Sequence, residues 1–152
     1  MSRRRNNWPL RAWAAVLLLT VAVAAMGKEK SVEELKAKYQ NASKPDEKAS
    51  LAIEIAESQV DAADQLIRQG KIDEGQKDIA DGIDYAGQAR DAALVTGHHI
   101  KKIEISVRKM AHRLTDMKRQ LTYEDQAPVQ AAIDQLEKIR TDLLSRMFKG
   151  NK

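Results

Sequence analysis

The 152-residue sequence contains no cysteine, three prolines, seven glycines and very few aromatic residues. Without cysteine the chain can form no disulfide and cannot be a lipoprotein whose lipid is attached through cysteine. Both tryptophans lie within the first 27 residues, so the rest of the chain has four aromatic side chains: Tyr39, Tyr85, Tyr123 and Phe148. It therefore lacks an aromatic platform for stacking bases or sugars, and its core must be built mainly from Ala, Leu, Ile, Val and Met.

The residue patterns of common catalytic and metal sites are also missing. The only histidines are His98, His99 and His112, and the outer two would lie about 21 Å apart along a helix, too far to share a metal. No Glu-x-x-His pair, Gly-x-Ser-x-Gly motif or glycine-rich phosphate loop is present. Several carboxylates have the spacing of an exposed helix face, where solvation accounts for them: Asp61, Asp64, Asp78, Asp81 and Asp84. We therefore expect no enzymatic activity, no catalytic residues, no metal and no cofactor.

Residues 1–27 have the features of a secretory signal peptide. An apolar run over residues 12–26 follows a positively charged front that contains Arg3, Arg4, Arg5 and Arg11. Small residues allow cleavage after Ala24 or Gly27. The run is shorter than the roughly 20 residues that a spanning helix needs, and an uncleaved membrane anchor is the alternative. In both cases we expect the body to be exported to a periplasmic or extracellular location.

Charge is balanced in the body but unevenly distributed. Without the four leader arginines, the 26 basic residues fall to 22 and match the 22 acidic residues. The basic isoelectric point thus belongs to the leader, and we expect no nucleic-acid binding. Residues 45–96 contain 12 acidic and 5 basic side chains, whereas residues 97–121 contain 7 basic and 2 acidic ones. This pattern predicts oppositely charged helices lying against each other, or alternatively a basic face offered to an anionic partner such as lipid headgroups or cell-wall polymer.

Helix signals divide the body into five segments. A capping box at Ser31 predicts a short leading helix over residues 32–41, and a proline followed by acids starts the next helix at Pro45. Glycines end this helix at Gly70 and the following one at Gly97, although a continuous rod across Gly97 is the alternative. No segment has the two-residue period of a strand.

Residues 100–121 carry a heptad seam with apolar side chains at alternating spacings of three and four. Its members are Ile100, Ile103, Val107, Met110, Leu114, Met117 and Leu121. A second capping box over residues 122–125 and Pro128 in the first turn predict a last helix that reaches Phe148.

Small residues follow one face of the helix that begins near residue 72. They are Gly75, Gly82, Ala86, Ala89 and Ala93. Glycine inside a helix costs roughly 1 kcal/mol relative to alanine. Two glycines seven residues apart therefore predict a neighbouring backbone that approaches closely.

The turn sequence Ala63-Asp-Gln-Leu-Ile-Arg-Gln-Gly-Lys-Ile-Asp-Glu74 resembles that of a tetratricopeptide repeat. The resemblance covers one unit, about residues 59–86, with Ile79 and Ile83 at the repeat's large apolar positions. It implies a two-helix unit of the kind that stacks into peptide-binding grooves. The segment from Leu121 to Gln126 is similar to the Leu-Thr-x-x-Gln signature of small helical periplasmic chaperones, although its glutamine comes one residue late.

Together these features predict an all-α protein, an antiparallel bundle of about four long helices plus a short N-terminal helix, either tetratricopeptide-like or four-helix-bundle-like. We expect a signal peptide over residues 1–27, a short leading helix and linker over 28–44, and a single helical domain over 45–149. The function expected is a non-enzymatic protein-interaction module of the cell envelope or periplasm, with a groove beside Gly75, Gly82 and Ala86. Its partner is an unknown protein or envelope component, with membrane contact only through an uncleaved leader. A periplasmic chaperone-like or stress protein that uses the basic helix and Met147-Phe148 is the alternative, and self-assembly through the heptad seam is a third.

Overall fold

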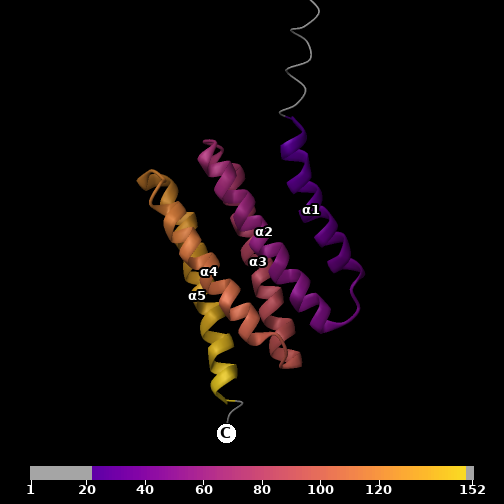
Figure 1. Ribbon diagram of the computed structural model, residues 1–152. Helices are drawn as coiled ribbons and strands as arrows, with labels where there is room; N and C mark the ends of the chain where they lie inside the picture. The colour runs from indigo at the N-terminus through magenta and orange to yellow at the C-terminus, as the bar shows by residue number, and fades with distance from the viewer. Residues whose placement is uncertain (1–21, 150–152) are drawn as a thin grey trace, which may run out of the picture.

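The protein is an all-α bundle, as the sequence predicts. The computed structural model describes the backbone of residues 22–149 and the side chains of residues 32–149. The long helices are α1 (Ala22–Asn41), α2 (Pro45–Arg68), α3 (Ile72–Thr96), α4 (Ile100–Lys118) and α5 (Gln126–Lys149), and a short 3-10 helix η1 (Tyr123–Asp125) precedes α5 (Figure 1). Residues 22–149 contain no strand. The predicted signal peptide lies mostly outside these residues, and within them no helix is long and apolar enough to cross a bilayer.

Glycines in the left-handed region end two helices where the sequence predicts. Gly70 follows α2 with φ of 79°, and Gly97 follows α3 with φ of 75°. The amide of Gly97 donates to the carbonyl of Ala93 at 2.8 Å and closes the last turn of α3. The helix therefore breaks at Gly97 and does not continue as a rod. A second left-handed residue, His99 with φ of 60°, completes this turn and was not foreseen.

The first helix begins earlier than its capping signal indicates. The sequence predicts a start at Ser31, but α1 begins at Ala22 and continues through Ser31. The preceding segment is rich in alanine and lacks proline, so nothing in it stops a helix from extending backwards.

Aromatic contacts hold α1 on the bundle. The ring of Tyr39 meets that of Tyr85 on α3 edge-on, with centroids 5.6 Å apart and planes at 85°. The Tyr39 hydroxyl donates to Gln88 Oε1 at 2.6 Å. Val32 and Ala42 are also buried. The segment expected as a leading helix and linker thus packs against the rest of the bundle.

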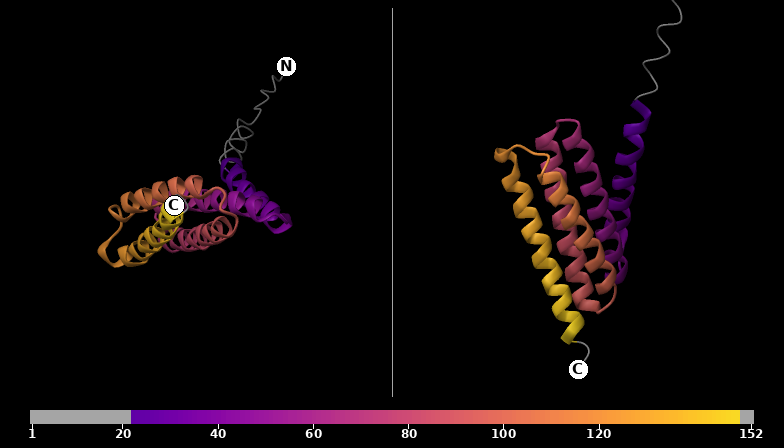
Figure 2. Two further views of the ribbon diagram at one scale, coloured as in Figure 1. Left: turned by 90° about the horizontal axis from the view of Figure 1, so that it is seen from below. Right: turned by 60° about the vertical axis from the view of Figure 1, so that its left-hand side comes forward.

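Two antiparallel hairpins, α2–α3 and α4–α5, stack side by side. Seen along the helices in Figure 2, α4 lies beside α2 in one layer and α5 beside α3 in the other, with α1 on the far side of α2. Neighbours within a layer run parallel, because several contacts join residues 52 positions apart: Asp46 with His98, Asp61 with Arg113, and Arg90 with Asp142. The α4–α5 hairpin therefore lies beside the α2–α3 hairpin in the same orientation.

The heptad seam lies in the core of this single chain. Ile103, Val107 and Leu114 are fully buried and share one apolar cluster with Leu136 and Leu143 of α5. Their burial is intramolecular, as in a folded domain. The seam is therefore covered and is not an exposed surface for self-assembly.

Candidate functional site

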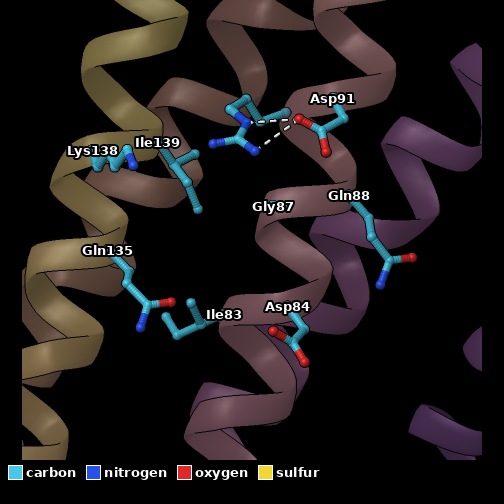
Figure 3. A pocket seen from close by; sticks show the side chains of 9 residues that line it. Ile83, Asp84, Gly87, Gln88, Asp91, Gln135, Lys138 and Ile139 are labelled. Carbon is cyan, nitrogen blue, oxygen red and sulfur yellow. Dashed lines mark hydrogen bonds and ion pairs between the residues drawn. The ribbon is translucent and has the colours of Figure 1, made fainter.

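A groove between α3 and α5 is the candidate functional site. Its larger part has a volume of about 520 Å³, and an adjoining part of about 170 Å³ extends it toward the start of α5. Both parts share Ile83, Asp84 and Gln135. In Figure 3, Ile83 of α3 and Gln135 of α5 lie in the space between the two helices.

Polar contacts cross from α3 to the second hairpin toward both ends of the groove. At one end, Arg90 Nη1 lies 3.1 Å from Asp142 Oδ2, and the same guanidinium pairs with Asp91 through Nη2 at 2.8 Å. At the other end, Gln76 Nε2 donates to the carbonyl of Asp125 at 3.1 Å. These contacts fix the separation of the two helices, so the groove between them is a preformed feature.

The middle of the groove combines apolar and polar side chains. Ile83 and Ile139 are buried, whereas Asp84, Gln135 and Lys138 are exposed. No ion pair to Asp84 or Lys138 is found among the described residues. The groove therefore offers an apolar floor between free charges of both signs.

Gly87 lies in the wall of this groove and has no steric role in the fold. A Cβ atom added there would meet no atom within 4 Å. Sequence reasoning missed this residue. The available signal was its spacing: Gly87 comes five residues after Gly82 and is out of step with the seven-residue interval from Gly75 to Gly82.

The small-residue face does not line a groove, which corrects the expected location. Gly75, Gly82 and Ala86 are buried. An added Cβ would lie 2.7 Å from Ile67 Cγ1 at Gly75 and 3.2 Å from the carbonyl oxygen of Ala56 at Gly82. These glycines permit the predicted close approach of a neighbouring backbone, and that neighbour is α2. Helix α2 therefore covers the face that was expected to bind a partner.

Acidic α2 and basic α4 lie against each other, as the charge pattern predicts. Arg113 of α4 pairs with Asp61 and Asp64, and Lys102 Nζ lies 3.4 Å from Glu54 Oε1. Asp64 was expected to be solvated, but its side chain is only 9% exposed. The spacing of carboxylates along one helix does not show which of them a neighbouring helix will cover.

The carboxyl of Asp64 is held in its charged form. Burial by itself raises its pKa, but hydrogen bonds from Arg68 at 3.0 Å and Arg113 at 3.4 Å outweigh burial, and the pKa lies below its usual value. A second buried carboxylate, Glu104, accepts from Arg140 Nε at 2.9 Å and joins α4 to α5. These contacts have a structural role between helices and place no acid-base pair at the groove.

The histidines are dispersed and exposed. His98 precedes α4, so it does not lie along that helix with His112 as the sequence suggests. His98 Nδ1 lies 2.9 Å from Asp46 Oδ2, and this hydrogen bond is the main cause of a lowered pKa at Asp46. Within the described part of the chain, no group of three or more His, Cys, Asp or Glu side chains is placed to hold a metal ion.

Two other surface features stand out. A recess of about 500 Å³ lies between α1, α2 and α3. Large apolar side chains are exposed at Val95, Tyr123 and Phe148, the last being 72% exposed. Val95 and Phe148 are the last residues but one of α3 and α5, so they lie near the C-terminal ends of two parallel helices.

Comparisons with known proteins give no relative from which a role could be transferred. No family model, no curated protein and no solved structure matches this chain.

Proposed function

We propose that the protein is an exported, non-enzymatic interaction module that binds a helical segment of a partner protein in the groove between α3 and α5. Gly87 is the observation that carries this proposal. Glycine inside a helix costs roughly 1 kcal/mol relative to alanine. Gly75 and Gly82 offset that cost by admitting α2, but no neighbour in the fold requires glycine at position 87. A partner helix that approaches the groove closely provides the missing reason.

The lining indicates what such a partner presents. An amphipathic helix inserts apolar side chains into a groove at intervals of three, four and seven residues. The buried isoleucines Ile83 and Ile139 suit such side chains, while Asp84 and Lys138 on the exposed flanks suit partner residues of opposite charge. The stacked hairpins and the tetratricopeptide-like turn are consistent with this role, because helical-repeat proteins bind segments of other proteins along stacked helices.

Export forms part of the proposal and rests on the leader sequence. Four arginines, an apolar run and small residues near position 27 are the features of a secretory signal. The partner is then a protein or component of the cell envelope.

The proposal can be tested by cross-linking in cells that naturally express the chain. A photoreactive amino acid at Gln135 should yield a discrete cross-linked partner, and the same amino acid at exposed Gln120, in the turn after α4, should not. Gly87→Leu should abolish the cross-link because it fills the groove, and Gly87→Ala should weaken it because a partner helix that requires glycine there would meet the added methyl group. Both variants should fold, since position 87 opens onto empty space. Cross-linking from Gln135 that is unaffected by Gly87→Leu would refute the groove.

The exposed apolar residues favour a second candidate, a chaperone that holds unfolded clients. Val95 and Phe148 are exposed near the C-terminal ends of α3 and α5. A chaperone would suppress aggregation of unrelated proteins and lose this activity in a Val95→Ser/Phe148→Ser variant. Gly87→Leu should leave this suppression of aggregation unchanged, so the variant distinguishes the two functions.

A further inference from the structure

The outward face of α4 carries cations that the fold does not use. Lys101, Arg108 and Lys109 are exposed and have no ion partner among the described residues. Exposed His112 lies on the same face, because positions 101, 105, 108 and 112 follow helical spacing. The three cations lie within about 12 Å along the helix axis.

The remaining cations of α4, and Arg119 directly after it, are already engaged. Lys102 and Arg113 pair with acidic residues of α2, and Arg119 pairs with Asp116 one turn away. Lys118 donates to Gln130 of α5 at 2.6 Å. The helix therefore divides its charge: one side neutralises α2, while the outward side remains positive. Because the α2 carboxylates are paired with Lys102 and Arg113 on the inner side, they neutralise little of the positive charge on the outward side.

We propose that this face of α4 docks on the surface of an anionic phospholipid bilayer. A flat, extended partner fits its shape, because none of the three recesses described above includes an α4 residue. Half-buried Ile105 lies between the cations, and long Lys and Arg side chains that flank an apolar residue are typical of helices at a membrane surface. A bilayer is favoured over nucleic acid because the leader predicted over residues 1–27 is of the kind that directs a chain to a membrane.

Vesicle sedimentation with the full chain tests the role of these charges. Each Lys or Arg near an anionic surface contributes about five-fold to the partition coefficient. The variant Lys101→Gln/Arg108→Gln/Lys109→Gln should therefore bind phosphatidylglycerol-containing vesicles about 100-fold more weakly. The matched control Lys77→Gln/Arg146→Gln/Lys149→Gln removes three exposed charges outside α4 and should bind nearly as the parent does. Equal loss in both triple variants, or no loss in the first, would overturn the proposal.

A site-specific label separates docking of α4 from attachment through the leader. Because the chain has no cysteine, His112→Cys and Ser145→Cys each introduce a unique labelling site on an exposed position. An environment-sensitive fluorophore at position 112, but not at 145, should shift when phosphatidylglycerol vesicles are added and should not shift with phosphatidylcholine alone. If the label at 112 does not respond to vesicles, or responds equally at 145, the docking surface is wrong. A response to soluble polyphosphate but not to vesicles would assign the face to a polyanion and overturn the bilayer.

Discussion

Glycine-to-alanine substitutions along α3 should have opposite effects on stability at two positions. At Gly75 an added Cβ would lie 2.7 Å from Ile67 Cγ1 and 3.1 Å from the Ala63 carbonyl oxygen, whereas carbon atoms prefer separations of about 3.5–4.0 Å. Ile67 would have to move by roughly 1 Å, and overpacking of this kind costs about 1–3 kcal/mol. The higher helix propensity of alanine offsets at most about 1 kcal/mol of this cost. We therefore expect Gly75→Ala to lower the free energy of unfolding by about 0–2 kcal/mol.

At position 87 alanine brings its higher helix propensity without a steric clash, because an added Cβ meets no atom within 4 Å. We expect it to raise the free energy of unfolding by up to about 1 kcal/mol. The two variants should differ by about 1–3 kcal/mol, which corresponds to roughly 4 °C in Tm for each kcal/mol in a chain of this size. Urea unfolding followed by far-UV circular dichroism measures the difference. Tryptophan fluorescence is unsuitable, because both tryptophans lie in the leader. If Gly75→Ala proves as stable as Gly87→Ala, the close packing of α2 against α3 is not the reason for glycine at position 75.

Two further predictions concern the core and the interface between α2 and α4. Val107→Asp should unfold the bundle, because an unpaired carboxylate at a fully buried position costs more than about 4 kcal/mol; exposed Lys109→Asp is the control, and a Val107→Asp chain that keeps the parental melting transition would contradict intramolecular burial of the seam. Asp64→Asn should lower stability at neutral pH by about 1 kcal/mol, a modest loss because both arginine partners are substantially exposed. The pKa of Asp64 is lower in the folded state than in the unfolded state, so its contribution is present above the unfolded value and is lost as pH falls through the folded value. Acid unfolding of Asp64→Asn should thus be less steep than that of the parent, and identical acid transitions would show that the carboxylate has no such role.

Local signals in the sequence predicted most helix ends, because their causes are local. Glycine adopts the left-handed region at positions 70 and 97 with no dependence on distant residues. The same reasoning was wrong at Ser31, where a possible cap was overridden by a preceding segment that is itself able to form a helix. His99 could not be predicted, because its left-handed conformation depends on how α4 docks after the turn.

The site was harder to predict because periodicity identifies a buried face without naming its neighbour. The pattern at Gly75 and Gly82 correctly indicated close packing, but it could not show that α2 is the element that approaches. Charge segregation likewise predicted contact between α2 and α4, although not that Asp64 would be buried between two arginines. The groove depends on the placement of α5 beside α3, which brings together residues about 50 positions apart.

The turn over residues 97–99 has a consequence for the number of chains in the assembly. It is short, and two left-handed residues, Gly97 and His99, reverse the chain there. A substitution that made this turn helical would join α3 and α4 into one rod and carry the α4–α5 hairpin away from its own partner. The contacts between residues 52 positions apart would then form between two chains. Asp61 of one chain would pair with Arg113 of the other in a domain-swapped dimer. The left-handed turn at Gly97 and His99 therefore keeps these pairings within a single molecule.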